Sequence, residues 1–471
     1  MNEEDRIQLK MNFGGAGKEK NSFRDHLFSA DFSILFEVSA PSADSELISS
    51  VDHAAPLAEF AASCREFPCS LAFTDASPDY HSFPVTEFAS ALVPESGRGS
   101  HVIYLSGRGR DEESVAGFFA QCRLEGFRNV VCVSGMPSLK RKNGKVYESV
   151  RMLVLNRESS DPLFTGAVVN PYKYEICASL AQSFKLAKKA RAGASFAVVQ
   201  FGWDAAKLQE VSWQLNRDGC NIPLLARLML MTPSAAMELC SDQYPGVRIS
   251  RNFQNALRGE MQLSTAQFLA AQWRRFQLHA AGAKFLGYSG LQIGGVESAS
   301  VARTAYQMIL DAFAEFTDYQ DWLEAMKDYY SQMDIVPYPW RYYLFDNLLQ
   351  PGMTREDANV SRESVPELTA GEKFRYSLAS RLFAKADCHP ASERRLSKKL
   401  LVSCRGCGEC RLPQSLFLCP ESCPLGFRNG PCGEVDISGK CFLSNSECVH
   451  SARVRLAVAR RDYRFLEETV V

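Results

Sequence analysis

The chain has 471 residues, which is more than one ordinary domain needs, so two or three domains are expected. Hydrophobic residues make up 46% of it and the formal net charge is −1, so no overall field attracts nucleic acid or an anionic membrane. No apolar run approaches the ~20 residues that span a bilayer, and Met1–Lys20 lacks the apolar core of a signal peptide. We therefore expect a cytoplasmic protein that binds neither nucleic acid nor membrane.

Residues 1–22 are polar and glycine-containing, which predicts a disordered tail. In residues 23–317, short apolar runs alternate with amphipathic stretches such as Glu112–Leu124 and Glu175–Ala192. The runs show little polar alternation, as expected for parallel strands covered by helices on both sides. Eight such β/α units favour an α/β fold of the (β/α)8 (TIM) barrel type over an open doubly wound sheet. The expected strands are Ile34–Val38, Ser70–Phe73, His101–Leu105, Asn129–Val133, Thr165–Val169, Ser195–Gln200, Ile222–Met229 and Phe285–Ile293.

Residues 318–400 are mainly helical in pattern and are interpreted as a helical linker. They include an aromatic-rich turn, Pro337–Tyr343, which also contains Arg341. Aromatic side chains beside arginine can stack on single-stranded nucleic acid, but packing of the linker against the barrel is the favoured interpretation. A small domain, residues 401–471, completes the chain and ends in a charged helix predicted over Ser451–Glu468.

The last domain contains eight of the chain's 16 cysteines. Thiolates at such short spacing can wrap one ion or cluster, and eight would complete two four-thiolate sites. Disulfides are the structural alternative, and the expected reducing compartment argues against them. The first three resemble the spacing that holds an iron–sulfur cube, whereas pairs separated by two residues also suit zinc; we favour iron–sulfur slightly. The predicted ligands are Cys404, Cys407, Cys410, Cys419, Cys423, Cys432, Cys441 and Cys448.

Glu37 follows two apolar residues near the end of the first expected strand. In a barrel of this type, reactive side chains lie at the C-terminal ends of the strands. A carboxyl group there would be partly desolvated, so burial could keep it protonated as a general acid. The alternative is a glutamate at the barrel mouth that is paired with a lysine.

Several segments resemble the methylenetetrahydrofolate reductase family, in order, over about residues 24–300. They are Leu35–Pro41, Phe73–Asp75, Leu105–Arg108, Arg128–Gly135, Phe164–Tyr174, Phe184–Phe196 and Gly287–Gly295. The cysteine-rich segment Cys419–Gly433 resembles the C-terminal domain that is fused to, or partners with, this family. The chain is most similar to the long reductases that carry such a domain.

The resemblance implies a flavin-dependent reduction of 5,10-methylenetetrahydrofolate, with FAD or FMN as cofactor and NAD(P)H or a redox protein partner as electron donor. It makes Glu37 the catalytic acid and places Gln200 against folate or nicotinamide. Lys185, Lys188 and Lys189 fall where the family holds the ribityl and phosphate part of the flavin; a solvated helix face is their alternative. The other flavin positions are Thr74, Tyr104, Ser134, Gly135, Met136, Asn170 and Tyr174.

Two positions depart from the family. Met136 stands where most members have an aspartate that serves flavin and folate, and a thioether offers no negative charge. Tyr104 stands where histidine or glutamine is usual. An alternative function is therefore a non-redox folate-binding or methyl-transfer component whose C-terminal module docks another protein. The sequence leaves the homo-oligomeric state open.

Overall fold

The computed structural model describes residues 21–470, except 75–81, 136–145, 174, 242–243, 245, 334–341, 353, 362–364, 385–394, 434 and 437–438. Residues 1–20 of the predicted disordered tail therefore lie outside the described residues. The next two residues are ordered, because the Asn21 side chain accepts a hydrogen bond from the Arg24 N–H and caps helix α2, Ser22–Leu27.

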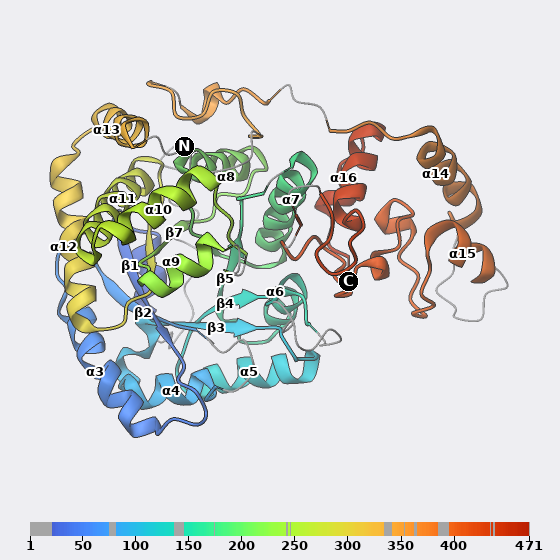
Figure 1. The fold of residues 1–471 in the computed structure, drawn as a ribbon. Coiled ribbons are helices and arrows are strands. Elements are labelled where there is room, and N and C mark those ends of the chain that lie inside the picture. Colours follow the sequence, from blue (N-terminus) through green and yellow to red (C-terminus); the bar gives the residue numbers. More distant parts are fainter. Residues whose placement is uncertain are drawn as a thin grey trace, which may run out of the picture.

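The described strands form a closed barrel of eight parallel strands in chain order (Figure 1). Pairing of the first strand with the last, with Ser33 beside Gly290, closes the ring and excludes the open sheet. The predicted fold class is confirmed. The strands are β1 Ser33–Ser39, β2 Cys69–Thr74, β3 Val102–Ser106, β4 Asn129–Val133, β5 Phe164–Val169, β6 Phe196–Val199, β7 Leu224–Met229 and β8 Gly290–Gly294.

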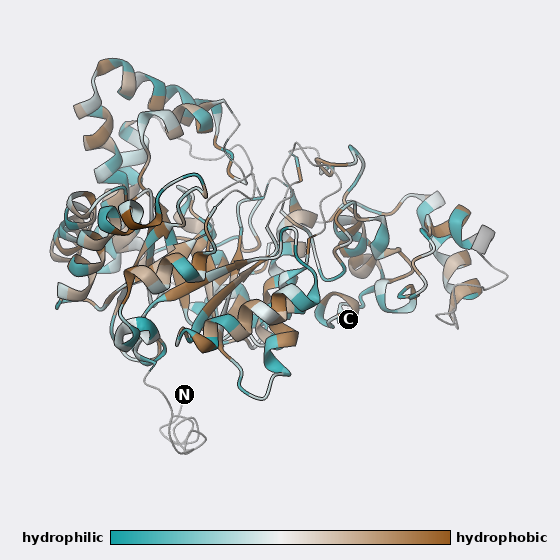
Figure 2. Cartoon of the chain, turned by 90° about the horizontal axis from the view of Figure 1, so that it is seen from below, coloured by the Kyte–Doolittle hydropathy of each residue, from teal (hydrophilic) through white to brown (hydrophobic). Residues whose placement is uncertain are grey.

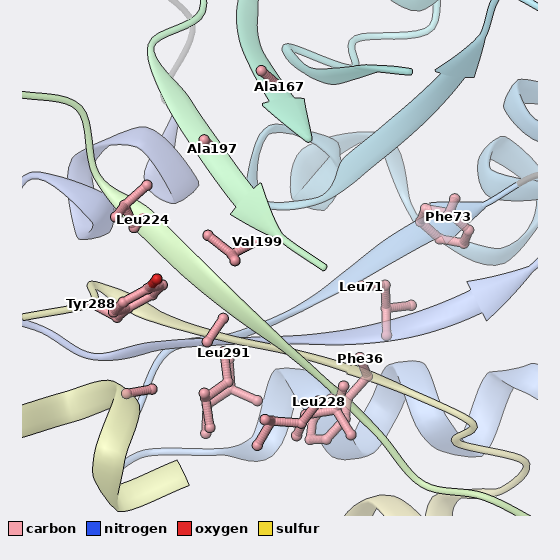
Figure 3. Packing of buried hydrophobic residues seen from close by; sticks show 14 of the residues in the cluster. Phe36, Leu71, Phe73, Ala167, Ala197, Val199, Leu224, Leu228, Tyr288 and Leu291 are labelled. Carbon is pink, nitrogen blue, oxygen red and sulfur yellow. The ribbon is translucent and has the colours of Figure 1, made fainter. Parts of the chain in front are cut away.

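Alternate residues of each strand face the helices or the barrel interior. Ile34 and Phe36 join the outer core with residues such as Leu71 and Leu291 (Figure 3), and hydrophobic residues are concentrated along the strands in Figure 2. Leu35, between them, faces inward, and the lower interior is closed by Phe23 of α2, whose ring contacts Phe196 at a centroid distance of 5.3 Å. The barrel is therefore filled at one end, and open space is confined to the other.

Helices cover the outside of the barrel (Figure 1). The predicted last strand began too early, because Phe285 ends α11 and β8 starts only at Gly290. A second small core, which includes Phe201 and Trp203, forms where α9 and α10 extend the mouth of the barrel. The helices up to this point are α3 Leu47–Ser63, α4 Val85–Leu92, α5 Glu112–Leu124, α6 Ser149–Arg157, α7 Ile176–Ala192, α8 Ala205–Arg217, α9 Pro233–Cys240, α10 Arg251–Leu263, α11 Thr265–Phe285 and α12 Ala299–Glu315.

The linker is less helical than predicted. It has α13 Tyr319–Gln332, α14 Ala370–Phe383 and α15 Arg395–Val402, but the described residues between 342 and 369 contain only one short 3-10 turn. Of the aromatic turn, only Tyr342 and Tyr343 are described. Tyr342 is buried in a cluster with Trp213 of α8, and the Tyr343 hydroxyl donates to Asp204 at 2.7 Å. These two residues pack on the barrel, as expected.

The C-terminal domain packs beside α7 (Figure 1). Its helices are α16 Val449–Arg460 and α17 Arg464–Glu467, so the single helix predicted over Ser451–Glu468 is wrong. The helix is interrupted because Arg461 adopts a left-handed conformation with φ of 54°. Val454 and Ala457 of α16 share an apolar cluster with Cys177 and Ala181 of α7. Within the described residues, no helix has both the length and the apolar character needed to span a membrane.

Candidate functional site

A cavity of about 1070 Å³ opens at the C-terminal ends of the barrel strands. This volume suits a ligand of cofactor size. The floor of the cavity consists of inward-facing residues near the strand ends, above the apolar layer that contains Leu35. Polar residues that line the cavity include Glu37, Thr74, Tyr104, Gln200, Arg227, Tyr244 and Gln292.

Glu37 forms a bidentate ion pair with Arg227 across the barrel. The Arg227 Nε donates to Glu37 Oε1 at 2.5 Å, and its Nη2 donates to Oε2 at 2.7 Å. Gln292 Nε2 also donates to Oε1, at 2.5 Å. A Cβ atom on Gly294 would lie 2.5 Å from Glu37 Oε2, so glycine at the end of β8 makes room for the carboxylate. Three donors thus hold Glu37 in one orientation.

The ion pair determines the charge of Glu37. Burial alone would raise the pKa of its carboxyl group, but the Arg227 charge and the hydrogen bonds from Arg227 and Gln292 outweigh it, so the pKa lies below its usual value. The prediction that burial keeps Glu37 protonated is therefore wrong for this arrangement. The alternative correctly expected an ion pair but named lysine instead of arginine.

The ion pair belongs to a five-residue hydrogen-bond network. Arg227 Nη1 donates to Gln200 Oε1 at 2.8 Å, and the Tyr104 hydroxyl donates to Gln292 Oε1 at 2.6 Å. Burial raises the pKa of Tyr104 well above its usual value, and the negative charge of Glu37 adds to this effect, so the phenol stays neutral. The network offers a ligand a partly buried ion pair and two amides within a single pocket floor.

The structure brings only some of the predicted site residues together. Glu37, Thr74, Tyr104 and Gln200 all line the cavity. Ser134 instead accepts from the Ser149 N–H at the start of α6. Gly135 adopts a positive φ of 71°, and a Cβ there would lie 2.5 Å from Ser106 Oγ. Asn170 donates to the Gly246 carbonyl at 2.8 Å. Met136 and Tyr174 lie outside the described residues.

The three lysines of α7 do not line this cavity. Lys185 Nζ lies 3.1 Å from Glu148 Oε1 and donates to the Gly430 and Pro431 carbonyls of the C-terminal domain. Lys189 donates to the Val168 carbonyl at 2.6 Å, and Lys188 lines a small pocket against His450 and Arg453. All three are buried, so the solvated-face alternative is wrong. The prediction that they hold a flavin phosphate is not supported, since Lys185 and Lys189 are engaged by protein groups and Lys188 faces the C-terminal domain.

Two residues of the floor were not predicted from the sequence. Arg227 and Gln292 lie side by side on β7 and β8, and each occupies an inward position of a mostly apolar strand. Each is a polar residue inside an apolar run. Each also falls on the alternation of inward and outward residues that makes Glu37 face the interior in β1, and this pattern could have identified them. Tyr244 gave no such signal, because it comes from an irregular segment after α9.

Seven of the eight predicted cysteine ligands fall into two groups, and the eighth, Cys432, is partly buried. Cys404, Cys407 and Cys410 approach Cys419, as electrostatic effects on the Cys419 thiol and a shared apolar cluster show. Cys423, Cys441 and Cys448 affect one another in the same way. As they stand, no three His, Cys, Asp or Glu side chains in the described ranges are close enough together to hold a metal ion.

Backbone groups nevertheless surround several sulfur atoms in a way that suits thiolate ligands. The Gly406 N–H donates to Cys404 Sγ at 3.4 Å, from two residues further on. The same spacing recurs at Cys419 with Glu421, at Cys423 with Leu425 and at Cys448 with His450. Such bonds favour the deprotonated sulfur that binds a metal, whereas burial has the larger effect and raises the pKa of the Cys419, Cys423 and Cys448 thiols. The donor chemistry therefore fits the predicted metal sites, although their metal content remains a prediction.

The fold and the cavity define a (β/α)8-barrel protein with a charged site at its mouth and a cysteine-rich domain docked on α7. Residues 383–470 match the family model described as "Methylene-tetrahydrofolate reductase C terminal". The C-terminal domain is therefore similar to that family, and the resemblance noted in its sequence is confirmed for these residues.

Several solved structures are similar to this chain at low identity. One is a protein from Clostridium thermocellum described as uncharacterized and as binding two copies of 5-methyl-5,6,7,8-tetrahydrofolic acid; it is 11% identical, with a TM-score of 0.46, over 62% of this chain and 99% of that one. A second is described as 2,3-dimethylmalate lyase; it is 13% identical, with a TM-score of 0.36, over 63% of this chain and 86% of that one. A third, from Burkholderia cenocepacia, is described as a "putative lyase/mutase"; it is 13% identical, with a TM-score of 0.34, over 66% of this chain and 94% of that one. No curated protein matches the chain.

Proposed function

We propose that the barrel binds a reduced folate in the cavity above Glu37 and catalyses the flavin-dependent reduction of 5,10-methylenetetrahydrofolate to 5-methyltetrahydrofolate. The observation that carries the proposal is the match of residues 383–470 to the methylenetetrahydrofolate reductase C-terminal family, together with the presence of Glu37, the catalytic position implied by the resemblance, in the cavity. The cavity volume also suits a pterin with its aminobenzoyl extension.

The ionised state of Glu37 gives it a specific role in this proposal. Opening of the five-membered folate ring produces a cationic iminium carbon, and hydride addition to that carbon yields the methyl group. A carboxylate fixed by Arg227 and Gln292 can stabilise such a cation in a partly dehydrated site. The proton for the ring nitrogen then comes from another source, such as solvent at the cavity mouth.

A flavin fits the described residues only in part. Thr74 and Tyr104 line the cavity, whereas the family's phosphate-binding positions on α7 are buried against the C-terminal domain. This observation favours a second candidate, a non-redox folate-binding or methyl-transfer component. An absorption spectrum of the purified protein distinguishes the two: flavin bands and flavin released on denaturation support the reductase, and their absence together with folate binding supports the second candidate.

Substitution of Glu37 tests the proposed site. Glu37→Gln removes the charge but keeps the size, so we expect methylenetetrahydrofolate turnover to fall about 100-fold or more, as when a transition-state charge loses its partner. Steady-state rates with an artificial electron donor measure this effect. Glu238→Gln, on the exposed surface of α9, is the matched control and should keep the wild-type rate. Equal rates for the wild type and Glu37→Gln would exclude a role for Glu37 in the reaction.

We also propose that the two cysteine groups bind metal, as iron–sulfur clusters or as zinc. Since thiolate–metal bonds contribute directly to folding, a strong chelator should lower the Tm of the C-terminal domain by about 5 °C or more. Elemental and sulfide analysis identifies the metal, and calorimetry measures the shift. The same chelator saturated with calcium is the control. A metal-free protein with an unchanged Tm would contradict this prediction.

A further inference from the structure

The loop that follows β5 connects the C-terminal domain to the barrel. Lys173, in this loop, is 3% exposed, and its Nζ donates to the Gly433 carbonyl at 2.6 Å. This charged hydrogen bond joins a buried ammonium group to a partly buried carbonyl and links the two segments. Gly433 itself has a φ of 105°, a conformation that favours glycine, so the geometry of this contact depends on the local sequence.

The same loop also holds a segment of the cavity wall. The Asn170 side chain accepts from the Tyr172 N–H at 3.1 Å and donates to the Gly246 carbonyl at 2.8 Å. Asn170 therefore links the loop that carries Lys173 to the irregular segment after α9. Gly246 has a positive φ of 72° and lies two residues after Tyr244.

Tyr244 extends this series of contacts to the cavity. It lines the cavity, and its ring meets Phe201 edge-on at a centroid distance of 5.5 Å. The Phe201 ring in turn lies 5.2 Å from the guanidinium carbon of Arg227. Hydrogen bonds, ring contacts and the covalent chain between them thus connect Gly433 with the charged floor of the cavity.

We propose that Lys173 is a positioning residue through which the C-terminal domain fixes the Tyr244 wall of the cavity. It touches neither a ligand nor the reacting atoms. Its bond to Gly433 holds the loop that carries Asn170, and Asn170 holds Gly246, two residues after Tyr244. The C-terminal domain is then part of the binding site, since it sets the wall against which a ligand packs.

Hydrogen exchange tests this proposal without any ligand. In Lys173→Met, amides of residues 244–250 should exchange at least about five-fold faster than in the wild type, because the wall loses its anchor. Lys173→Arg retains a donor and should restore much of the protection. Lys440→Met replaces an exposed lysine of the same domain and should leave exchange unchanged. Faster exchange confined to residues 428–435, or spread over the whole barrel, would overturn the proposal.

A second variant covers the case in which Lys173→Met does not fold. Asn170→Ala cuts the link to Gly246 but leaves the Lys173–Gly433 bond in place, so exchange should rise at residues 244–250 and stay at wild-type levels at 428–435. Unchanged exchange at 244–250 would refute the link.

Ligand affinity provides the second readout, and this arm rests on the proposed function. With 5-methyltetrahydrofolate as the probe, Lys173→Met should weaken binding five- to ten-fold, a coupling of the size expected between connected sites. Unchanged affinity in a variant that binds the probe would overturn the positioning role. If the wild type does not bind the probe, the proposed function fails, while the exchange experiment still decides the role of Lys173.

Discussion

Arg227→Met is expected to lower the free energy of unfolding by about 3 kcal/mol at pH 7, since it leaves a buried carboxylate without its partner. In the wild type the pKa of Glu37 lies below its usual value of 4.5. The ion pair therefore contributes stability above that pH and loses it as the pH falls through the lowered pKa. In the variant, burial instead raises the pKa. The deficit relative to wild type should be largest near neutral pH and shrink below about pH 5. Urea unfolding between pH 4 and 7.5 measures it.

The double variant Glu37→Gln/Arg227→Met is the control for this prediction. With both charges removed, no unpaired ion stays buried, so the double variant should be more stable than Arg227→Met alone. A deficit that is the same at pH 4 and pH 7 would show that lost packing, and not the ion pair, explains the effect. A double variant no more stable than Arg227→Met would point to the same conclusion.

Glu148→Gln should loosen the C-terminal domain from the barrel. The Glu148 carboxylate pairs with Lys185 at 3.1 Å and accepts from the backbone N–H groups of Arg428 and Asn429, and both charged side chains are 3% exposed. Loss of the charge leaves the buried Lys185 ammonium with two carbonyl acceptors but no counter-ion, at a cost of about 3 kcal/mol in the free energy of unfolding. We expect unfolding to split into two transitions, with faster proteolytic release of the C-terminal domain.

Glu315→Gln provides the matched comparison. It breaks the pair with Arg274, where the side chains are 43% and 34% exposed, and exposed pairs contribute at most about 1 kcal/mol. Equal destabilisation by Glu148→Gln and Glu315→Gln would mean that the interface pair has no special role. A single unfolding transition in Glu148→Gln, with the midpoint of the wild type, would lead to the same conclusion.

The fold was predictable because apolar runs and amphipathic stretches repeat along the barrel region, and a strand's position follows from local residues. The predicted strand Asn129–Val133 and helix Glu112–Leu124 match the structure residue for residue. Glu37 was singled out by its place near the end of a strand, whereas Thr74, Tyr104 and Gln200 were indicated only by the family resemblance; all four line the cavity.

The remaining parts of the site depend on contacts between distant segments. The partner of Glu37 is Arg227, 190 residues away, and only barrel closure brings the two together. The α7 lysines were misjudged for a similar reason. A cation on a helix has the same local sequence whether it meets a phosphate, water or another domain, and here Lys185 meets residues 245 positions further along the chain.

Helix α2 closes one end of the barrel, so the barrel is open at the other end only. Its Phe23 ring seals the end of the barrel opposite the cavity, against Phe164 and Phe196. Ligands must therefore enter and leave by the same rim, past the segments that the C-terminal domain supports. Phe23→Ala would open the closed end of the barrel to water, which would reach the apolar layer beneath the charged floor.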